Sequence, residues 1–214
     1  MTEPREHSSE ANPAAFCTAT YVEASPQAER EAVRVLAAYR DMGRVGRGTD
    51  RVDIVQRVDR PGQFVILAVW PEQQTYEEHR AGEHFQQLDA QLATLLIAPN
   101  DTRHHHPLTV GEQAVEKAGG VTVVTHVDVV PPEKDNALVV LEQLARESRL
   151  HAGNNQFDVW QQTNRPNHFT VVERWADRAV LDEHAAAPQT RAFRTSLSRM
   201  TGALYDERWY RALS

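Results

Sequence analysis

The chain has 214 residues, of which 41% are hydrophobic and 25% charged, with a formal net charge of −7 at pH 7. This composition is ordinary for a soluble globular protein, no apolar run approaches the roughly 20 residues that span a bilayer, and an acidic chain without a basic cluster is not typical of proteins that bind nucleic acid or an anionic membrane surface. The single cysteine, Cys17, allows no intramolecular disulfide, so we expect a cytoplasmic protein.

The first half of the chain begins with a polar segment. Residues 1–15 lack the apolar core of a secretory signal, so we expect a disordered tail. Residues 16–110 form the first predicted repeat, and residues 111–120 a linker. The elements predicted in this repeat are a strand over Phe16–Glu23, a helix whose apolar face carries Ala32, Val35, Leu36 and Tyr39, a hairpin over Val52–Trp70, and a helix with Leu88, Leu92 and Leu95.

Residues 121–214 show the same order of elements more clearly. Pro131-Pro132 follows a β-branched run, which favours a strand that leads into a helix start. Asp177 suits an N-cap, and Pro188 is expected to break or restart the helix that follows. The predicted elements are a strand over Val121–Val129, a helix over Asp135–Leu150, a hairpin over Phe157–Trp175, a helix that continues through Phe193, Leu197 and Met200, and a strand over Ala203–Tyr210.

The two halves match each other at a constant offset of 105 residues. Arg60-Pro61 of the first half falls on Arg165-Pro166 of the second, and Trp70 falls on Trp175. A period of this length indicates duplication of a whole domain. Each copy has the order β-α-β-β-α-β, which is the ferredoxin-like arrangement.

The apolar pattern predicts an α+β fold in which the two repeats pack sheet to sheet as a fused barrel. A four-stranded sheet with helices on one face leaves its other face to be covered, and two such sheets can cover each other. Val55 and Trp160, at equivalent positions, lie on the strand face opposite to Ile54 and Val159. Apolar residues on both faces favour a sheet that is buried on both sides. The alternative is two separate ferredoxin-like domains joined by the linker.

The second repeat carries a hairpin with an aromatic and acidic strand end, followed by a histidine in the next helix. Its residues resemble the antibiotic biosynthesis monooxygenase (ABM) domain family, and the resemblance covers both repeats. The motif consists of Phe157-Asp158-Val159, Pro166-Asn167-His168-Phe169, Glu173-Arg174-Trp175, His184, Arg191, Phe193 and Leu197. The resemblance implies a dimeric α+β barrel, here as a pseudo-dimer fused into one chain that can associate further as a homo-oligomer.

The resemblance also implies a range of activities. Family members oxidise polycyclic aromatic phenols to quinones with dioxygen and no cofactor, act on quinols, or degrade haem, and others have no known chemistry. We therefore expect a cofactor-independent monooxygenase, an oxidoreductase whose partners are a small aromatic molecule and dioxygen. The alternatives are a haem-binding or haem-degrading protein, a non-catalytic barrel that binds an aromatic ligand, and a structural barrel without an open pocket.

An indole and an imidazole recur at the same spacing in both repeats. Trp175 ends a strand and His184 follows in the next helix, and Trp70 and His79 repeat the pair. An indole wall suits a flat aromatic ligand, and an imidazole can take a phenolic proton near neutral pH. We therefore predict His184 as the catalytic base and Trp175, Trp70 and His79 as substrate-binding residues. The competing interpretation is that Trp175 and His184 pack in the core.

Three further residues complete the predicted substrate site. His126 lies in the first strand of the second repeat, where the first repeat has Tyr21. Phe193 and Arg191 lie in the predicted last helix, and Arg191 is suited either to a phenolate or carboxylate or to the solvated helix surface.

The histidines do not predict a metal site. His104, His105 and His106 alternate between the two faces of a strand, so they cannot converge on one ion. In the haem-degrading branch of the family, an Asn on the first strand is expected beside the Trp and the His. Neither Phe16–Glu23 nor Val121–Val129 contains an Asn, which disfavours haem degradation but leaves haem binding through His184 open.

Overall fold

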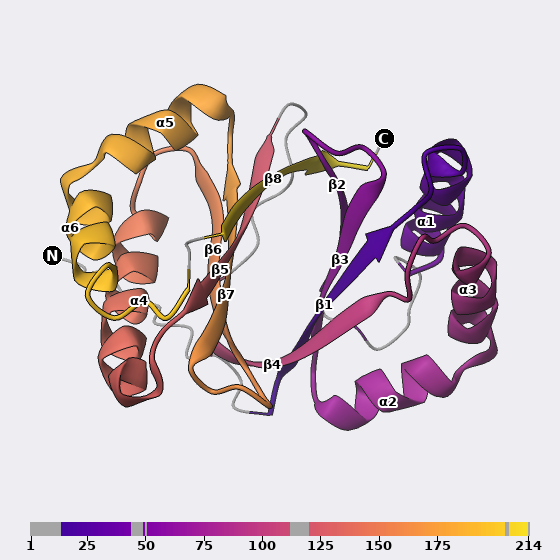
Figure 1. Ribbon diagram of the computed structural model, residues 1–214, viewed down its shortest axis with the longest axis horizontal. Helices are drawn as coiled ribbons and strands as arrows, with labels where there is room; N and C mark the ends of the chain where they lie inside the picture. Colours follow the sequence, from indigo (N-terminus) through magenta and orange to yellow (C-terminus); the bar gives the residue numbers. More distant parts are fainter. Residues whose placement is uncertain (1–13, 44–48, 50, 112–119, 204–205, 214) are drawn as a thin grey trace, which may run out of the picture.

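The computed structural model describes residues 14–43, 49, 51–111, 120–203 and 206–213. Most of the expected tail (1–15) and of the expected linker (111–120) lies outside the described residues. The described chain forms two curved sheets that face each other, with a layer of helices outside each sheet (Figure 1).

Each repeat has the expected order of elements. The first repeat contains β1 (Phe16–Glu23), α1 (Glu29–Gly43), β2 (Arg51–Arg57), β3 (Gln63–Trp70), α2 (Gln73–Ala81), α3 (Glu83–Ala93) and β4 (Asp101–Thr109). The second contains β5 (Val121–Asp128), a short 3-10 turn η1 (Pro131–Glu133), α4 (Lys134–Arg149), β6 (Asn154–Gln162), β7 (His168–Trp175), α5 (Arg178–Ala186), α6 (Pro188–Leu197) and β8 (Asp206–Ala212).

The second helix of each repeat is divided in two. Pro188 begins α6 after an extended Ala187, so the expected restart at this proline is confirmed. In the first repeat, Gly82 is extended in the same way between α2 and α3, with φ −69° and ψ 147°. The sequence pattern predicted a single helix there, because a glycine in a helical pattern does not by itself show that the helix ends.

The eight strands close into one antiparallel barrel in the order β1-β3-β2-β8-β5-β7-β6-β4. The halves are joined on both sides, because β2 pairs with β8 and β4 pairs with β6. The predicted fused α+β barrel is confirmed, and the alternative of two separate domains is wrong. Equivalent strands lie four places apart in the ring, so a half-turn about the barrel axis relates the repeats.

The helices and the lumen form separate cores. Each helical layer packs an apolar cluster against the outside of its sheet, as with Leu36 in the first repeat and Leu141 in the second. A third cluster fills the barrel interior and contains Val55 and Trp160, both at most 1% exposed. The sequence prediction that these two residues face away from the helices is confirmed.

One end of the lumen is closed by ion pairs that cross between the repeats. Arg174 of β7 lies 2.9 Å from Asp53 of β2, and Arg51 of β2 pairs with Asp158 of β6. Asp53 and Asp158 occupy equivalent positions in the two repeats, so each half supplies an anion to a cation of the other. Asp158 also accepts a hydrogen bond from the side chain of Gln156.

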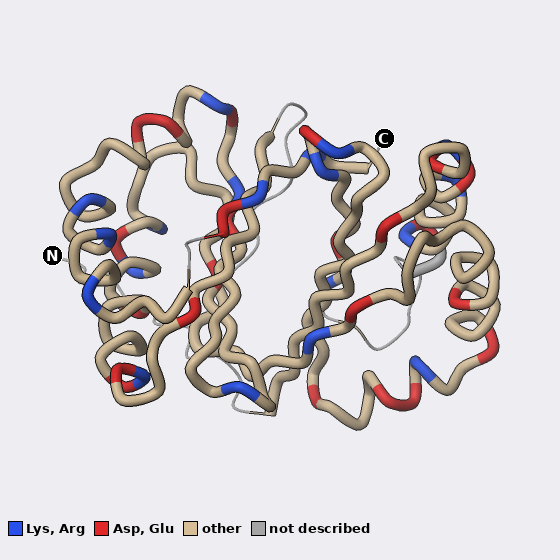
Figure 2. The backbone as a smooth tube through the Cα atoms, viewed as in Figure 1, with Lys and Arg blue, Asp and Glu red and all other residues tan. Residues whose placement is uncertain are grey.

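The outer surface has a mixed charge. Figure 2 shows Lys and Arg interspersed with Asp and Glu over both helical layers of the described chain. Within those residues, no helix is long and apolar enough to cross a membrane.

Candidate functional site

The predicted indole–imidazole pair of the second repeat lies between the sheet and the helices. Trp175, at the end of β7, stacks on His184 of α5 with ring centroids 4.3 Å apart and an interplanar angle of 28°. His184 Nε2 lies 3.3 Å from the hydroxyl of Thr190 in α6. The two rings are 0% and 3% exposed. Strand and helix therefore bring the pair together as the spacing predicts, and the packing around it is closed.

The surroundings of His184 keep it uncharged. Burial, then the nearby His151 and Arg194, lowers the pKa of His184 to about 4. Phe157 and His151 present their rings edge-on to the imidazole at 6.0 and 5.6 Å. His184 Nδ1 is buried without a hydrogen-bond partner in the part of the chain that the structure describes. A neutral imidazole can accept a proton, but one of such low basicity is a weak acceptor at pH 7.

Phe193 and Arg191 lie on different faces of α6. Phe193 is buried in the same apolar cluster as Trp175. Arg191 is exposed, which is the solvated alternative that the sequence left open.

Glu173 is a member of this site that the sequence did not assign. It lies two residues before Trp175 on the same face of β7, and Trp175 Nε1 donates to Glu173 Oε2 at 3.0 Å. Burial raises the pKa of Glu173 to about 7, although the hydrogen bond from Trp175 opposes the rise. The signal in the sequence was a carboxylate alternating with buried aromatic residues, which favours the neutral acid.

The first repeat carries the equivalent pair in a more polar setting. The rings of Trp70 and His79 are 4.9 Å apart and tilted by 48°. His79 Nε2 lies 2.6 Å from the hydroxyl of Tyr39 in α1. Trp70 Nε1 donates to Thr18 at 3.2 Å, and the ring of Tyr76 lies 5.4 Å from the indole.

A small cavity adjoins this first pair. Its volume is about 20 Å³, about the space that one water molecule needs. Its wall combines hydroxyl groups with aromatic rings from the sheet and all three helices. The lining includes Thr18, Tyr39, Trp70, Tyr76, Phe85 and Asn100, and the rest of the wall is mostly aliphatic, as at Val52 and Leu88.

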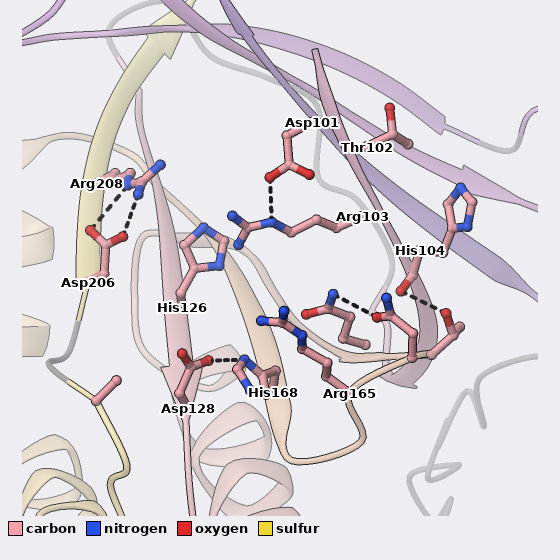
Figure 3. Close-up of a pocket in the computed structure, with 14 residues that line it drawn as sticks. Asp101, Thr102, Arg103, His104, His126, Asp128, Arg165, His168, Asp206 and Arg208 are labelled. Carbon is pink, nitrogen blue, oxygen red and sulfur yellow. Dashed lines mark hydrogen bonds and ion pairs between the residues drawn. The ribbon is translucent and has the colours of Figure 1, made fainter. Parts of the chain in front are cut away.

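His126 lies inside the barrel and not between the sheet and the helices. Its strand, β5, turns this side chain into the barrel, whereas Trp175 on the neighbouring β7 points to the helices. His126 lines a cavity of about 720 Å³ (Figure 3). By strand register, this cavity lies at the end of the barrel opposite to the cross-repeat ion pairs. The predicted residues therefore divide between two helix–sheet clefts, the barrel mouth and, for Arg191, the surface.

The three consecutive histidines alternate as strand geometry requires. His104 Nε2 lies 3.3 Å from the hydroxyl of Tyr76 on the helical side, and His105 Nε2 lies 3.0 Å from Thr170 inside the barrel. His106 is exposed. Across the described residues, no group of three or more His, Cys, Asp or Glu side chains is placed to hold a metal ion.

The closed barrel and its two matching tryptophan–histidine pairs define a class: a tandem α+β barrel protein in which one chain supplies both halves. The family model for antibiotic biosynthesis monooxygenase matches residues 15–91 and 120–196, together more than half of the chain. The chain therefore belongs to the antibiotic biosynthesis monooxygenase family and carries two copies of its domain, as the sequence resemblance indicated.

One relative and two solved structures illustrate what this chain is similar to. "Putative monooxygenase YcnE" of Bacillus subtilis (strain 168) is 27% identical over 64 residues, which cover 30% of this chain and 67% of YcnE. A "putative monooxygenase" of Fusobacterium nucleatum has a TM-score of 0.87 at 12% identity, over 94% of this chain and 93% of its own. Another from Lactobacillus acidophilus NCFM has a TM-score of 0.81 at 13% identity, over 94% and 95%. At these identities the structural likeness shows the fold.

Proposed function

We propose that this protein is a monooxygenase that oxidises an electron-rich phenol or quinol with dioxygen, without a bound cofactor, in a cleft between sheet and helices. The family match supports monooxygenase chemistry. The recurring indole and imidazole support a flat aromatic substrate. The observation that carries the choice of cleft is the cavity beside Trp70.

The proposed reaction balances without an external reductant. A phenol with a hydrogen on its para carbon reacts with one dioxygen molecule to give a para-quinone and one water molecule. One oxygen atom forms the new carbonyl and the other leaves as water, and the substrate supplies all the electrons. A quinol with a free ring carbon–hydrogen bond reacts with the same balance, giving a hydroxyquinone and one water molecule. The protein has to take the phenolic proton, because the phenolate gives up an electron to dioxygen more readily than the phenol does.

Tyr39 and His79 are placed to take that proton. The Tyr39 hydroxyl lines the cavity and is hydrogen-bonded to His79 Nε2 at 2.6 Å. A substrate hydroxyl beside Tyr39 would pass its proton to the tyrosine oxygen as the tyrosine proton moves to His79. His79 then has the role of base that the sequence assigned to its counterpart, His184.

The first cleft suits a substrate better than the second. His184 has a pKa near 4 and lies under closed packing, whereas the Tyr39–His79 pair adjoins open space. The present space admits about one water molecule. An aromatic ring therefore requires α2 and α3 to move apart, and the extended Gly82 between them is a suitable hinge.

Oxygen uptake with a panel of hydroquinones and polycyclic phenols tests this proposal. We expect one dioxygen consumed per substrate and one ¹⁸O atom from ¹⁸O₂ in the quinone. Tyr39→Phe and His79→Gln should each lower kcat by about 10²-fold or more, since they remove the proton acceptor. His184→Gln, the matched change in the second repeat, should lower kcat by less than about threefold on the same reasoning.

The outcomes separate the two clefts. A large loss with His184→Gln and none with His79→Gln would move the reaction to the second repeat and restore His184 as its base. Hydrogen peroxide formed without ¹⁸O in the product would contradict monooxygenation. Uptake that is unaffected by either histidine change would contradict both assignments.

A further inference from the structure

A second cavity lies at the mouth of the barrel, away from both tryptophan–histidine pairs. Its volume is about 720 Å³, which is within the range of small-molecule sites. Its wall comes from both repeats: the start of β4, the end of β5, the β6–β7 hairpin and the start of β8. The cavity is thus a product of the fusion of the two halves.

Two arginines related by the half-turn flank this mouth. Arg103 on β4 and Arg208 on β8 are equivalent residues, and each binds the aspartate two positions before it on its strand. Arg103 Nε lies 2.9 Å from Asp101, and Arg208 Nη2 lies 2.6 Å from Asp206. Both guanidinium groups face the ring of Tyr21 in the lumen, at 4.8 and 5.8 Å from its centroid. The aspartates hold the arginine heads in place.

His126 lines the cavity, and one of its ring nitrogens is buried behind the cavity wall. It is 9% exposed, and its Nε2 is buried without a hydrogen-bond partner among the residues that the structure describes. Its ring meets the ring of Tyr21 edge-on at 5.4 Å. Burial, then the charges of Arg103 and Arg208, lowers the pKa of His126 to about 4. Because that nitrogen is closed off from the cavity, the donors that a ligand in the cavity meets are the guanidinium groups of the wall.

Arg165 brings a third guanidinium from the β6–β7 hairpin. No ion pair holds its side chain within the described residues, whereas the neighbouring His168 is paired with Asp128 at 2.6 Å. Figure 3 shows the heads of Arg165 and Arg103 directed toward the space beside His126. Arg103 donates to Asp101 from Nε. Its two Nη atoms have no hydrogen-bond acceptor among the described residues, so they remain available to a ligand.

We propose that the barrel mouth binds a small organic carboxylate whose carboxyl group lies between Arg103, Arg165 and His126. A guanidinium presents two parallel donors that match the two oxygens of a carboxylate. The wall contains three arginines and three aspartates, so the preference for a carboxylate comes from the direction of the free guanidinium donors of Arg103 and Arg165 and not from a net positive charge. This proposal is independent of the function proposed for the helix–sheet clefts.

Calorimetric titration of the full chain with benzoate, phthalate and inorganic phosphate tests the proposal. We expect benzoate or phthalate to bind and to raise the melting temperature of the wild type. Arg165→Gln should weaken that binding by about tenfold to a hundredfold, the effect expected from loss of a charge-assisted hydrogen bond. Arg146→Gln, the same change at an exposed arginine on α4, should leave it unchanged.

A second variant keeps the test independent of folding. His126→Gln retains a hydrogen-bonding side chain, and its effect is read as the carboxylate affinity of protein whose circular dichroism matches the wild type. Weaker binding in both His126→Gln and Arg165→Gln supports the proposal. Absence of carboxylate binding, equal affinities in Arg165→Gln and Arg146→Gln, or tighter binding of inorganic phosphate than of either carboxylate would overturn it.

Discussion

Buried histidines make the stability of this protein sensitive to acid. His105, His126 and His184 are each at most 9% exposed. Burial lowers the pKa of His105 to about 3, and those of His126 and His184 to about 4. In the unfolded chain, histidines take up protons near pH 6.5. Between about pH 6.5 and 4 the unfolded state therefore binds more protons, and the free energy of unfolding falls as the pH falls.

His184→Gln should remove part of this acid sensitivity. In the folded wild type, His184 stays unprotonated until about pH 4. Between pH 7.5 and pH 4.5, the free energy of unfolding of the wild type should therefore fall by roughly 2 kcal/mol more than that of the variant. Urea unfolding at both pH values measures the difference. His84→Gln changes an exposed histidine and should keep the wild-type pH profile. Equal pH dependence in wild type and His184→Gln would contradict the lowered pKa.

Glu173 has the opposite dependence on pH. Its pKa in the folded state, about 7, lies above the value of 4.5 expected without burial. Protonated Glu173 therefore contributes its full stabilisation to the folded state below about pH 4.5. As the pH rises from there through 7, that contribution to the free energy of unfolding is lost. Glu173→Gln keeps an acceptor for Trp175 Nε1 and cannot ionise.

We therefore expect Glu173→Gln to be more stable than the wild type at pH 8, by roughly 3 kcal/mol, with the advantage below about 1 kcal/mol at pH 5. Thermal unfolding in low-salt buffer at the two pH values measures this crossover. An advantage that does not change with pH would mean that the amide stabilises the site by packing alone. A less stable variant at pH 8 would show that ionised Glu173 is well accommodated.

At the scale of elements, the helix that follows Trp175 differs from its counterpart after Trp70. The Asp177 side chain caps α5 by accepting from Val180 N at 3.0 Å. Glu72 holds the equivalent N-cap position of α2, and its side chain makes no capping bond. Asp177→Ala should therefore lower the free energy of unfolding by about 1 kcal/mol, and Glu72→Ala by much less. Differential scanning calorimetry of the matched pair tests this, and equal losses would contradict the capping role.

The same comparison shows what the sequence predicts and what it does not. The strands, the barrel and the closeness of Trp175 to His184 follow from alternation and from a constant spacing within a strand–loop–helix unit. The presence of open space does not follow, because it depends on packing between elements that are distant in sequence. Tyr39 and Tyr76 beside the first cavity correspond to Leu144 and Leu181 in the second repeat, but their contribution is visible only when α1, α2 and the sheet are assembled.

The cavity at the barrel mouth could not be predicted from the sequence for a related reason. His126 was predicted as a substrate residue, and it does line a cavity. However, the residues around it come from β4, β8 and the β6–β7 hairpin, which only meet once the two repeats close into one ring. Alternation gives the face of a strand that a residue occupies, whereas barrel closure decides which strands share a mouth.

At the scale of the whole molecule, closure makes the halves depend on each other. The β2–β8 and β4–β6 pairings join them, and the ion pairs Arg174–Asp53 and Arg51–Asp158 bury charges from both repeats in one lumen. A half that separated would expose two strand edges and the apolar sheet face that now lines the lumen. We therefore expect the chain to unfold in one cooperative transition, with equal calorimetric and van't Hoff enthalpies.

Asp158→Asn tests this coupling most directly. Asp158 is fully buried and pairs with Arg51 of the other repeat, so the variant removes one of the two carboxylates around that guanidinium and leaves Asp53 at 3.6 Å as its partner. The expected loss is about 2–3 kcal/mol, the value for a hydrogen bond to a charged group. Asp182→Asn, which breaks an exposed pair with Arg178 within α5, should cost at most about 1 kcal/mol. Because the lost contact is between repeats, Asp158→Asn should lower the stability of both halves together. Two separate transitions in the variant would show that the ion pairs hold together domains that are otherwise independent, and a loss no larger than that of Asp182→Asn would show that strand pairing alone couples the halves.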